Sequence, residues 1–161
     1  MDVWRICLAR HAPDGATAFS GEGSRLYGGR WSSRGTTVAY AGTTLSLAAL
    51  EFLVHAEIGR LSRVELVACV ARCPRDVSVE SVPEPRLPAR WRAAPAPRAL
   101  AALGDSWVRE KRSALLLVPS AIIPRESNVL LNPAHPDAAR IEYGVPEPFR
   151  FDGRLVAGRG R

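Results

Sequence analysis

The chain has 161 residues, of which 47% are hydrophobic and 24% are charged, and this balance is typical of one folded domain rather than a disordered or fibrous chain. No apolar run reaches the roughly 20 residues that a membrane span needs, and the first residues lack the apolar core of a signal peptide. We therefore expect a cytoplasmic protein without membrane contact. The net charge of +6 indicates an anionic partner: a nucleotide, a nucleic acid or an acidic protein.

Two short strands separated by a long loop are expected in the first part of the chain. WRICLAR, residues 4–10, has the length and composition of a strand, and TTVAYA, residues 36–41, is rich in residues that favour strands. Residues 11–35 between them are rich in glycine, serine and threonine. This composition predicts a loop, and long loops in compact domains usually serve function.

A helix is expected next, up to about Ile58. Thr43 or Thr44 can cap its N-terminus by accepting a hydrogen bond from a free backbone N–H group, and Gly59 can end it. The helical stretch, LSLAALEFLVHAEI, is apolar except for a few polar positions.

The second half of the chain mixes strands and helices without a regular strand–helix–strand repeat. A proline-rich stretch predicts an irregular connection over residues 74–97, and the tail 156–161 is expected to be disordered. The other expected elements are strands at 64–73, 113–120, 128–132 and 148–155, and a helix at 98–112 that Gly104 weakens. We therefore expect one α+β domain over residues 1–161, with a mixed β-sheet core and flanking helices.

Glu51 is a lone carboxylate in the apolar stretch of the first expected helix. At about 100° per residue, Glu51 and His55 share one face, and Ser46 and Glu57 share a nearly opposite one. A helix packed on a sheet needs only one solvent-facing stripe, so one polar pair needs a second explanation. Glu51 can form an internal salt bridge with His55 or an arginine. Alternatively, it is an acid in a partly dry pocket, where its charge acts on a developing cation.

The sequence GGRW places Arg30 after two glycines and before Trp31. Glycines allow a ligand to approach the backbone closely, and a guanidinium can bind phosphate oxygens by two hydrogen bonds. The pattern is neither a P-loop nor a dinucleotide-binding turn. Tyr40, at the end of the next expected strand, is either a core aromatic or a ring that stacks on a flat heterocycle.

Polar side chains also follow the later strands. Ser120 ends the strand expected at 113–120, and Asn128 begins the one at 128–132. A turn serine or asparagine commonly bonds to the nearby backbone, which is the simpler explanation for both. No GxSxG motif surrounds Ser120, so a serine hydrolase is not indicated.

The cysteines and histidines show no metal-binding pattern. Three cysteines without CxxC spacing are typical of small core residues in a reduced protein, and the three histidines are scattered. We therefore expect no metal site.

Taken together, these segments resemble the RES domain, the toxin half of RES–Xre toxin–antitoxin pairs. The matching stretches are GGRWSSRGTTVAYAGTTLSLAALEFLVH, VPSAIIPRESNVLLNPAHPD and FRFDGRL, in that order. The resemblance covers about residues 4–155, with the proline-rich stretch matching least. It implies an ADP-ribosyltransferase-like fold and a toxin that consumes NAD⁺ and arrests growth.

On this match, Arg30, Glu51 and Ser120 are the arginine, glutamate and serine for which the family is named, and Tyr40 is its active-site tyrosine. These four are the expected catalytic residues. The residues expected to bind NAD⁺ are Arg30, Trp31, Tyr40, His55, Ser120 and Asn128. The resemblance also implies an Xre-type antitoxin as partner and, within a toxin–antitoxin complex, a homodimer.

The sequence leaves the acceptor of the ADP-ribosyl group open between water, inorganic phosphate and a protein side chain. Hydrolysis or phosphorolysis would deplete NAD⁺, whereas an ADP-ribosyltransferase would modify a specific protein target. A basic nucleic-acid-binding module without enzyme activity is the further alternative, because of the net charge of +6.

Overall fold

The computed structural model describes residues 1–156, without the side chains of residues 58, 60, 62 and 156. Five α-helices, four 3₁₀ helices and eight strands are assigned in these residues. The strands are β1 (Asp2–Leu8), β2 (Ala39–Gly42), β3 (Leu66–Arg72), β4 (Val79–Ser81), β5 (Leu115–Pro119), β6 (Ser127–Leu131), β7 (Glu142–Tyr143) and β8 (Glu147–Phe149), and the helices are α1 (Gly15–Ala18), α2 (Glu22–Tyr27), α3 (Leu45–His55), α4 (Arg98–Arg109) and α5 (Gly153–Val156).

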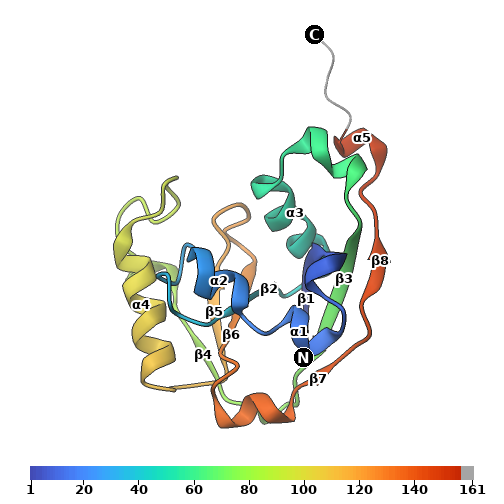
Figure 1. The fold of residues 1–161 in the computed structure, drawn as a ribbon. Helices are drawn as coiled ribbons and strands as arrows, with labels where there is room; N and C mark the ends of the chain where they lie inside the picture. The colour runs from blue at the N-terminus through green and yellow to red at the C-terminus, as the bar shows by residue number, and fades with distance from the viewer. Residues whose placement is uncertain (157–161) are drawn as a thin grey trace.

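The strands form one mixed sheet in the order β4-β5-β6-β2-β1-β3-β7, and β8 pairs with β3. The pair β4–β5 is parallel and the other pairs are antiparallel. Helix α3 packs on β1 and β2, and α4 lies beside the β4–β5 end of the sheet (Figure 1). The α+β class with a mixed sheet and flanking helices is therefore confirmed.

The sheet is weakly joined at its centre. β1 pairs with β3 along its whole length, from Asp2 to Leu8. In the part of the chain that the structure describes, β1 pairs with β2 only where Trp4 faces Gly42. The carbonyl of Tyr40 on β2 instead accepts a hydrogen bond from Nη1 of Arg5 at 2.7 Å. The two strands therefore diverge, and the Arg5 side chain bridges the opening with this hydrogen bond.

Two hydrophobic clusters hold the sheet and helices together. One is built on β1, β3 and β6 around residues such as Val3, Ala71 and Leu131. The other packs α4 against β5 and β6, with Trp107 fully buried next to Leu116. Helix α4 therefore anchors the β4–β5 end of the sheet, and α3 covers the opening between β1 and β2.

Several element boundaries differ from the sequence-based expectation. Thr44 is the N-cap of α3, as expected, and its side chain accepts from the Leu47 N–H group. The helix ends at His55 rather than near Ile58, and a 3₁₀ helix follows over Ile58–Arg63.

The expected loop at 11–35 contains α1 and α2. The Asp14 side chain caps α1 by accepting a hydrogen bond from the Thr17 N–H group. Such a cap can be recognised in the sequence, but the high glycine content of the segment predicted a loop instead. The irregular connection at 74–97 contains the short strand β4, and the last expected strand is limited to β8, with α5 after it.

A single domain over 1–161 stays a prediction. The expected disordered tail lies outside the described residues, except Val156, which ends α5. No helix within residues 1–156 is long and apolar enough to cross a membrane.

The close approach of α4 to the loop before β2 generates a stability prediction. A Cβ added at Gly104 would lie 1.8 Å from the Trp31 carbonyl oxygen. Gly104→Ala should therefore lower the free energy of unfolding by about 1–3 kcal/mol, measured by urea denaturation, although helix propensity alone would raise it.

Gly23→Ala in α2 is the matched control, because a Cβ there meets no atom within 4 Å. This variant should be neutral or up to about 1 kcal/mol more stable. A Gly104→Ala protein as stable as the Gly23→Ala protein would contradict the steric explanation.

Candidate functional site

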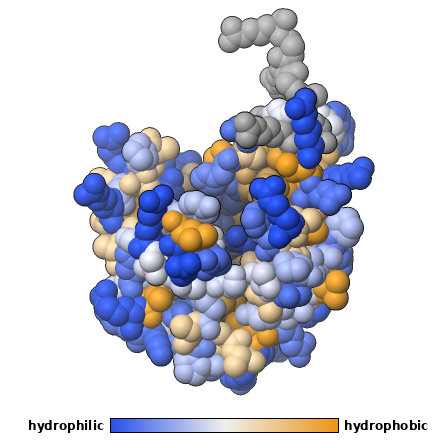
Figure 2. Space-filling view, viewed as in Figure 1, coloured by the Kyte–Doolittle hydropathy of each residue, from blue (hydrophilic) through white to orange (hydrophobic). Residues whose placement is uncertain are grey.

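A cavity of about 870 Å³ lies where β1 and β2 diverge. This volume is within the ~300–1,000 Å³ typical of small-molecule and cofactor sites. Its walls come from β1, β2, α2, α3, the glycine-rich loop and residues 94–96. Figure 2 shows the surface hollowed between the α4 side and the α3 side of the molecule. The cavity therefore joins segments that are far apart in the sequence.

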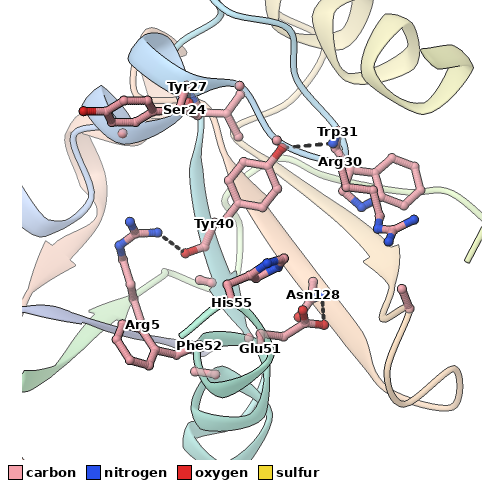
Figure 3. A pocket seen from close by; sticks show the side chains of 18 of the residues that line it. Arg5, Ser24, Tyr27, Arg30, Trp31, Tyr40, Glu51, Phe52, His55 and Asn128 are labelled. Atoms are coloured by element: carbon pink, nitrogen blue, oxygen red, sulfur yellow. Dashed lines mark hydrogen bonds between the residues drawn. The ribbon is translucent and has the colours of Figure 1, made fainter. Parts of the chain in front are cut away.

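Glu51 reaches this cavity from the middle of α3 (Figure 3). Its Oε1 atom accepts a hydrogen bond from Ser120 Oγ at 2.7 Å and one from Asn128 Nδ2 at 2.5 Å. Among the described residues, no ion pair involves Glu51. The structure thus shows Glu51 held by neutral donors rather than in a salt bridge with His55 or an arginine, and its Oε2 atom takes no part in these bonds.

Ser120 lies behind Glu51, and its side chain is fully buried. Besides donating to Glu51, its hydroxyl accepts hydrogen bonds from the N–H groups of Ile122 at 3.1 Å and Ile123 at 3.0 Å. Ser120 therefore organises the turn after β5, as expected, and also contacts Glu51, whereas its catalytic role stays a prediction. Its hydroxyl is fully engaged within the protein, so it orients Glu51 and does not line the cavity.

Asn128 lines the cavity next to Glu51. Its Nδ2 atom donates to Glu51, while its Oδ1 atom is buried and has no hydrogen-bond partner among the described residues. A buried acceptor without a partner is costly, and a hydroxyl or N–H group of a ligand would relieve that cost.

Tyr40 projects from β2 between Arg5 and Trp31 (Figure 3). Its hydroxyl accepts from the Trp31 N–H group at 3.0 Å and shares a hydrogen bond of 2.9 Å with Ser32 Oγ. A Cβ at Gly29 would lie 2.6 Å from this hydroxyl, so the position requires glycine. Burial raises the pKa of Tyr40, which keeps the phenol protonated and able to donate.

Arg30 is half-buried at the wall of the cavity that adjoins the proline-rich connection. Its Nη1 atom donates to the carbonyl oxygens of Trp91 at 2.6 Å and Ala93 at 3.1 Å. Arg30 and Glu51 therefore line one cavity without contacting each other. Trp31 is 2% exposed and belongs to the α4 cluster, so its ring serves mainly as core.

His55 is exposed at the end of α3 and lines the cavity. The structure thus brings Arg30, Trp31, Tyr40, Glu51, His55 and Asn128 to one cavity, with Ser120 behind it.

Several further lining residues were not predicted from the sequence, and those with large side chains include Arg5, Tyr27 and Phe52. Arg5 could have been found, because it is a cation inside a short strand that is otherwise largely apolar. The other two carried no pattern that separates a cavity wall from core or surface. Among the described residues, no group of three or more His, Cys, Asp or Glu side chains could hold a metal ion.

Comparisons with known proteins test the resemblance to the RES domain. The sequence model of the RES domain matches residues 2–152. The chain is 37% identical over 155 residues to "Prs ADP-ribosylating toxin" of Sphingobium sp. (strain YBL2), covering 95% of both chains. It is 36% identical over 157 residues to "Toxin Res" of Yersinia enterocolitica, covering 96% of this chain and 99% of the relative.

The fold is similar to that of a solved chain from the M. tuberculosis MbcT–MbcA toxin–antitoxin complex. The TM-score is 0.75, and the match covers 92% of this chain and 84% of that chain. The sequence identity is 16%, so this similarity is one of fold.

The hydrogen bonds of the Tyr40 hydroxyl generate a prediction about the glycine-rich loop. Tyr40→Phe leaves the Trp31 N–H group without its acceptor and should lower the free energy of unfolding by about 1–3 kcal/mol, measured by urea denaturation. Tyr27→Phe is the control, because Tyr27 is 75% exposed and its hydroxyl meets water. Equal stability of the two variants would show that the hydroxyl does not fasten the loop.

Proposed function

The chain belongs to the RES domain family, and from this premise we propose that it is the toxin of a type II toxin–antitoxin system and cleaves the nicotinamide–ribose bond of NAD⁺. Relatives that match this chain over at least 95% of their length carry toxin names, which supports this proposal. One of them is named as ADP-ribosylating. The cavity and the carboxylate within it favour an enzyme over a nucleic-acid-binding module.

The observation that carries the proposal is the hydrogen bonding of Glu51. When the bond between ribose C1′ and the nicotinamide nitrogen breaks, its electron pair leaves with the nitrogen, and nicotinamide departs as a neutral molecule. The ribose is left with a positive, oxocarbenium-like centre. A nearby carboxylate stabilises that charge, and it does so most strongly when no cation neutralises it. Ser120 and Asn128 are neutral donors, so they fix Glu51 without cancelling its charge.

The other cavity residues have separate roles in this proposal. Asn128 can donate to Glu51 while its unpartnered Oδ1 accepts from a ribose hydroxyl or from the nicotinamide amide. Tyr40 orients the nicotinamide ring. Arg30 binds the nicotinamide-ribose end of NAD⁺ by charge-assisted hydrogen bonds. Trp31 supports Arg30 from the core, and His55 lies at the mouth.

The acceptor completes the reaction by forming a bond from its own nucleophilic atom to C1′ and losing a proton. Water gives ADP-ribose, inorganic phosphate gives a phosphorylated ADP-ribose, and a protein side chain gives an ADP-ribosylated protein. Transfer to a specific protein is the second candidate function, and the name of the Sphingobium relative favours it.

We further propose that an antitoxin of the Xre type binds this protein and that the toxin pairs with a second copy within that complex. The solved structure of similar fold comes from a toxin–antitoxin complex, which supports the antitoxin partner.

Glu51→Gln should abolish NAD⁺ consumption while keeping the fold. The glutamine carbonyl oxygen can accept the same two hydrogen bonds, but it carries no charge. We expect kcat to fall by at least about 100-fold, measured by the release of nicotinamide.

Glu65→Gln is the matched control, because Glu65 is an exposed carboxylate outside the cavity lining. It should retain full activity. A folded Glu51→Gln protein that turns over NAD⁺ at the original rate would remove Glu51 from the mechanism.

NAD⁺ labelled in its adenylate part, incubated with the protein and a cell lysate, distinguishes the two candidate functions. Free ADP-ribose or its phosphate means degradation, and a labelled protein band that the Glu51→Gln variant does not produce means transfer. Absence of both products with folded wild-type protein would contradict the proposed bond cleavage.

A further inference from the structure

We propose that Arg5 and Tyr27 form a subsite for the adenosine diphosphate half of the dinucleotide, with Arg5 binding the diphosphate and Tyr27 stacking on the adenine. This inference rests on the proposed cleavage of NAD⁺, because it assigns the substrate's second half to the same cavity. Both residues line the cavity, and neither belongs to the sequence motifs that identified the site.

Arg5 is a half-buried cation without a carboxylate partner. Among the described residues no ion pair involves it, and its buried Nε atom has no hydrogen-bond partner. One guanidinium nitrogen, Nη1, donates to the Tyr40 carbonyl. A charge removed from water is costly unless an opposite charge or several hydrogen bonds compensate it. A diphosphate in the cavity would supply that missing charge.

The thiol of Cys7, two residues along the same strand, reflects this positive environment. A hydrogen bond with Cys69 and the charge of Arg5 together lower the pKa of Cys7 to about 7. Arg5 is thus one of the groups that lower this pKa, although the hydrogen bond with Cys69 is the larger cause and burial opposes both.

Tyr27 is an aromatic side chain left in solvent at the mouth of the cavity. It is 75% exposed, and its hydroxyl has no hydrogen-bond partner among the described residues. It ends α2, directly before Gly28 and the loop that carries Arg30. Exposed aromatic rings at a nucleotide cavity offer a flat surface on which a base can stack, because every base has a π face.

The position of the two residues relative to the rest of the site supports the assignment. Figure 3 shows Arg5 and Tyr27 on one side of Tyr40, and Arg30 and Trp31 on the other side, with Glu51 and Asn128 at the bottom of the view. If Glu51 faces the nicotinamide ribose, the Arg5–Tyr27 side is open for the rest of the molecule. At the Arg30 side, Nη1 of that arginine already donates hydrogen bonds to the carbonyl oxygens of residues 91 and 93.

The subsite is tested with ADP, which contains only the proposed half of the substrate, and with nicotinamide mononucleotide, which lacks the adenosine and one of the two phosphates. Tyr27→Ala and Arg5→Gln should each weaken ADP binding at least about fivefold in calorimetry. With NAD⁺, Tyr27→Ala should raise KM by a similar factor without lowering kcat. Its kcat/KM for nicotinamide mononucleotide should stay within about twofold of wild type.

Matched variants separate the subsite from general effects. Tyr27→Phe keeps the ring and should bind ADP like the wild type, as should Leu26→Ala, because Leu26 is exposed but outside the cavity lining. Arg98→Gln removes an exposed charge outside the cavity and should leave ADP binding unchanged. Thermal melting shows whether Arg5→Gln has lost the fold through its bond to Tyr40. If it has, Tyr27→Ala and the salt dependence of ADP binding carry the test.

Wild-type ADP affinity in Tyr27→Ala would overturn the proposal, and so would an equal loss for ADP and nicotinamide mononucleotide. ADP binding that does not weaken as salt is raised would overturn the role of Arg5. A failure of the proposed function has a different signature, because a wild-type protein that binds ADP through these residues but releases no nicotinamide would contradict only the cleavage.

Discussion

A carboxylate that two neutral side chains hold by one oxygen loses its freedom to rotate without being paired with a cation. Glu51 is in this state, because Ser120 and Asn128 both donate to Oε1. The three residues are in α3, directly after β5 and at the second position of β6, so the arrangement exists only when the helix and both strands are correctly packed. The buried serine in turn depends on the turn that follows β5.

The weak pairing between β1 and β2 explains why the cavity lies where it does. A continuous ladder would close the sheet, whereas here a single pair of residues joins the two strands and Arg5 bonds to the carbonyl left free on Tyr40. The unpaired backbone is thereby satisfied without closing the space. The aromatic ring of Tyr40 then divides the cavity into the Arg5 side and the Arg30 side.

Local chemistry made much of this fold predictable from the sequence. The strand compositions, the Thr44 cap and the anomalous position of Glu51 are all properties of short segments. Tertiary contacts decided the rest. Nothing local indicates that Ser120 turns inward to Glu51 or that Arg30 bonds to the backbone of the proline-rich connection. The role of Gly104 also depends on a distant partner, since it is weak for a helix but allows the Trp31 carbonyl to approach.

Arg30 donates hydrogen bonds to the proline-rich connection only at the carbonyl oxygens of Trp91 and Ala93, among the described residues. Every residue type presents the same carbonyl group, so these two contacts are insensitive to the side chains around them. Ala93 can therefore be replaced while the arginine remains in place, provided the path of the backbone is kept, whereas Trp91 is fixed by its own packing in the cluster around α4. The shape of this wall is thus uncoupled from the bonds that hold Glu51, because none of the Arg30 contacts involves Ser120 or Asn128.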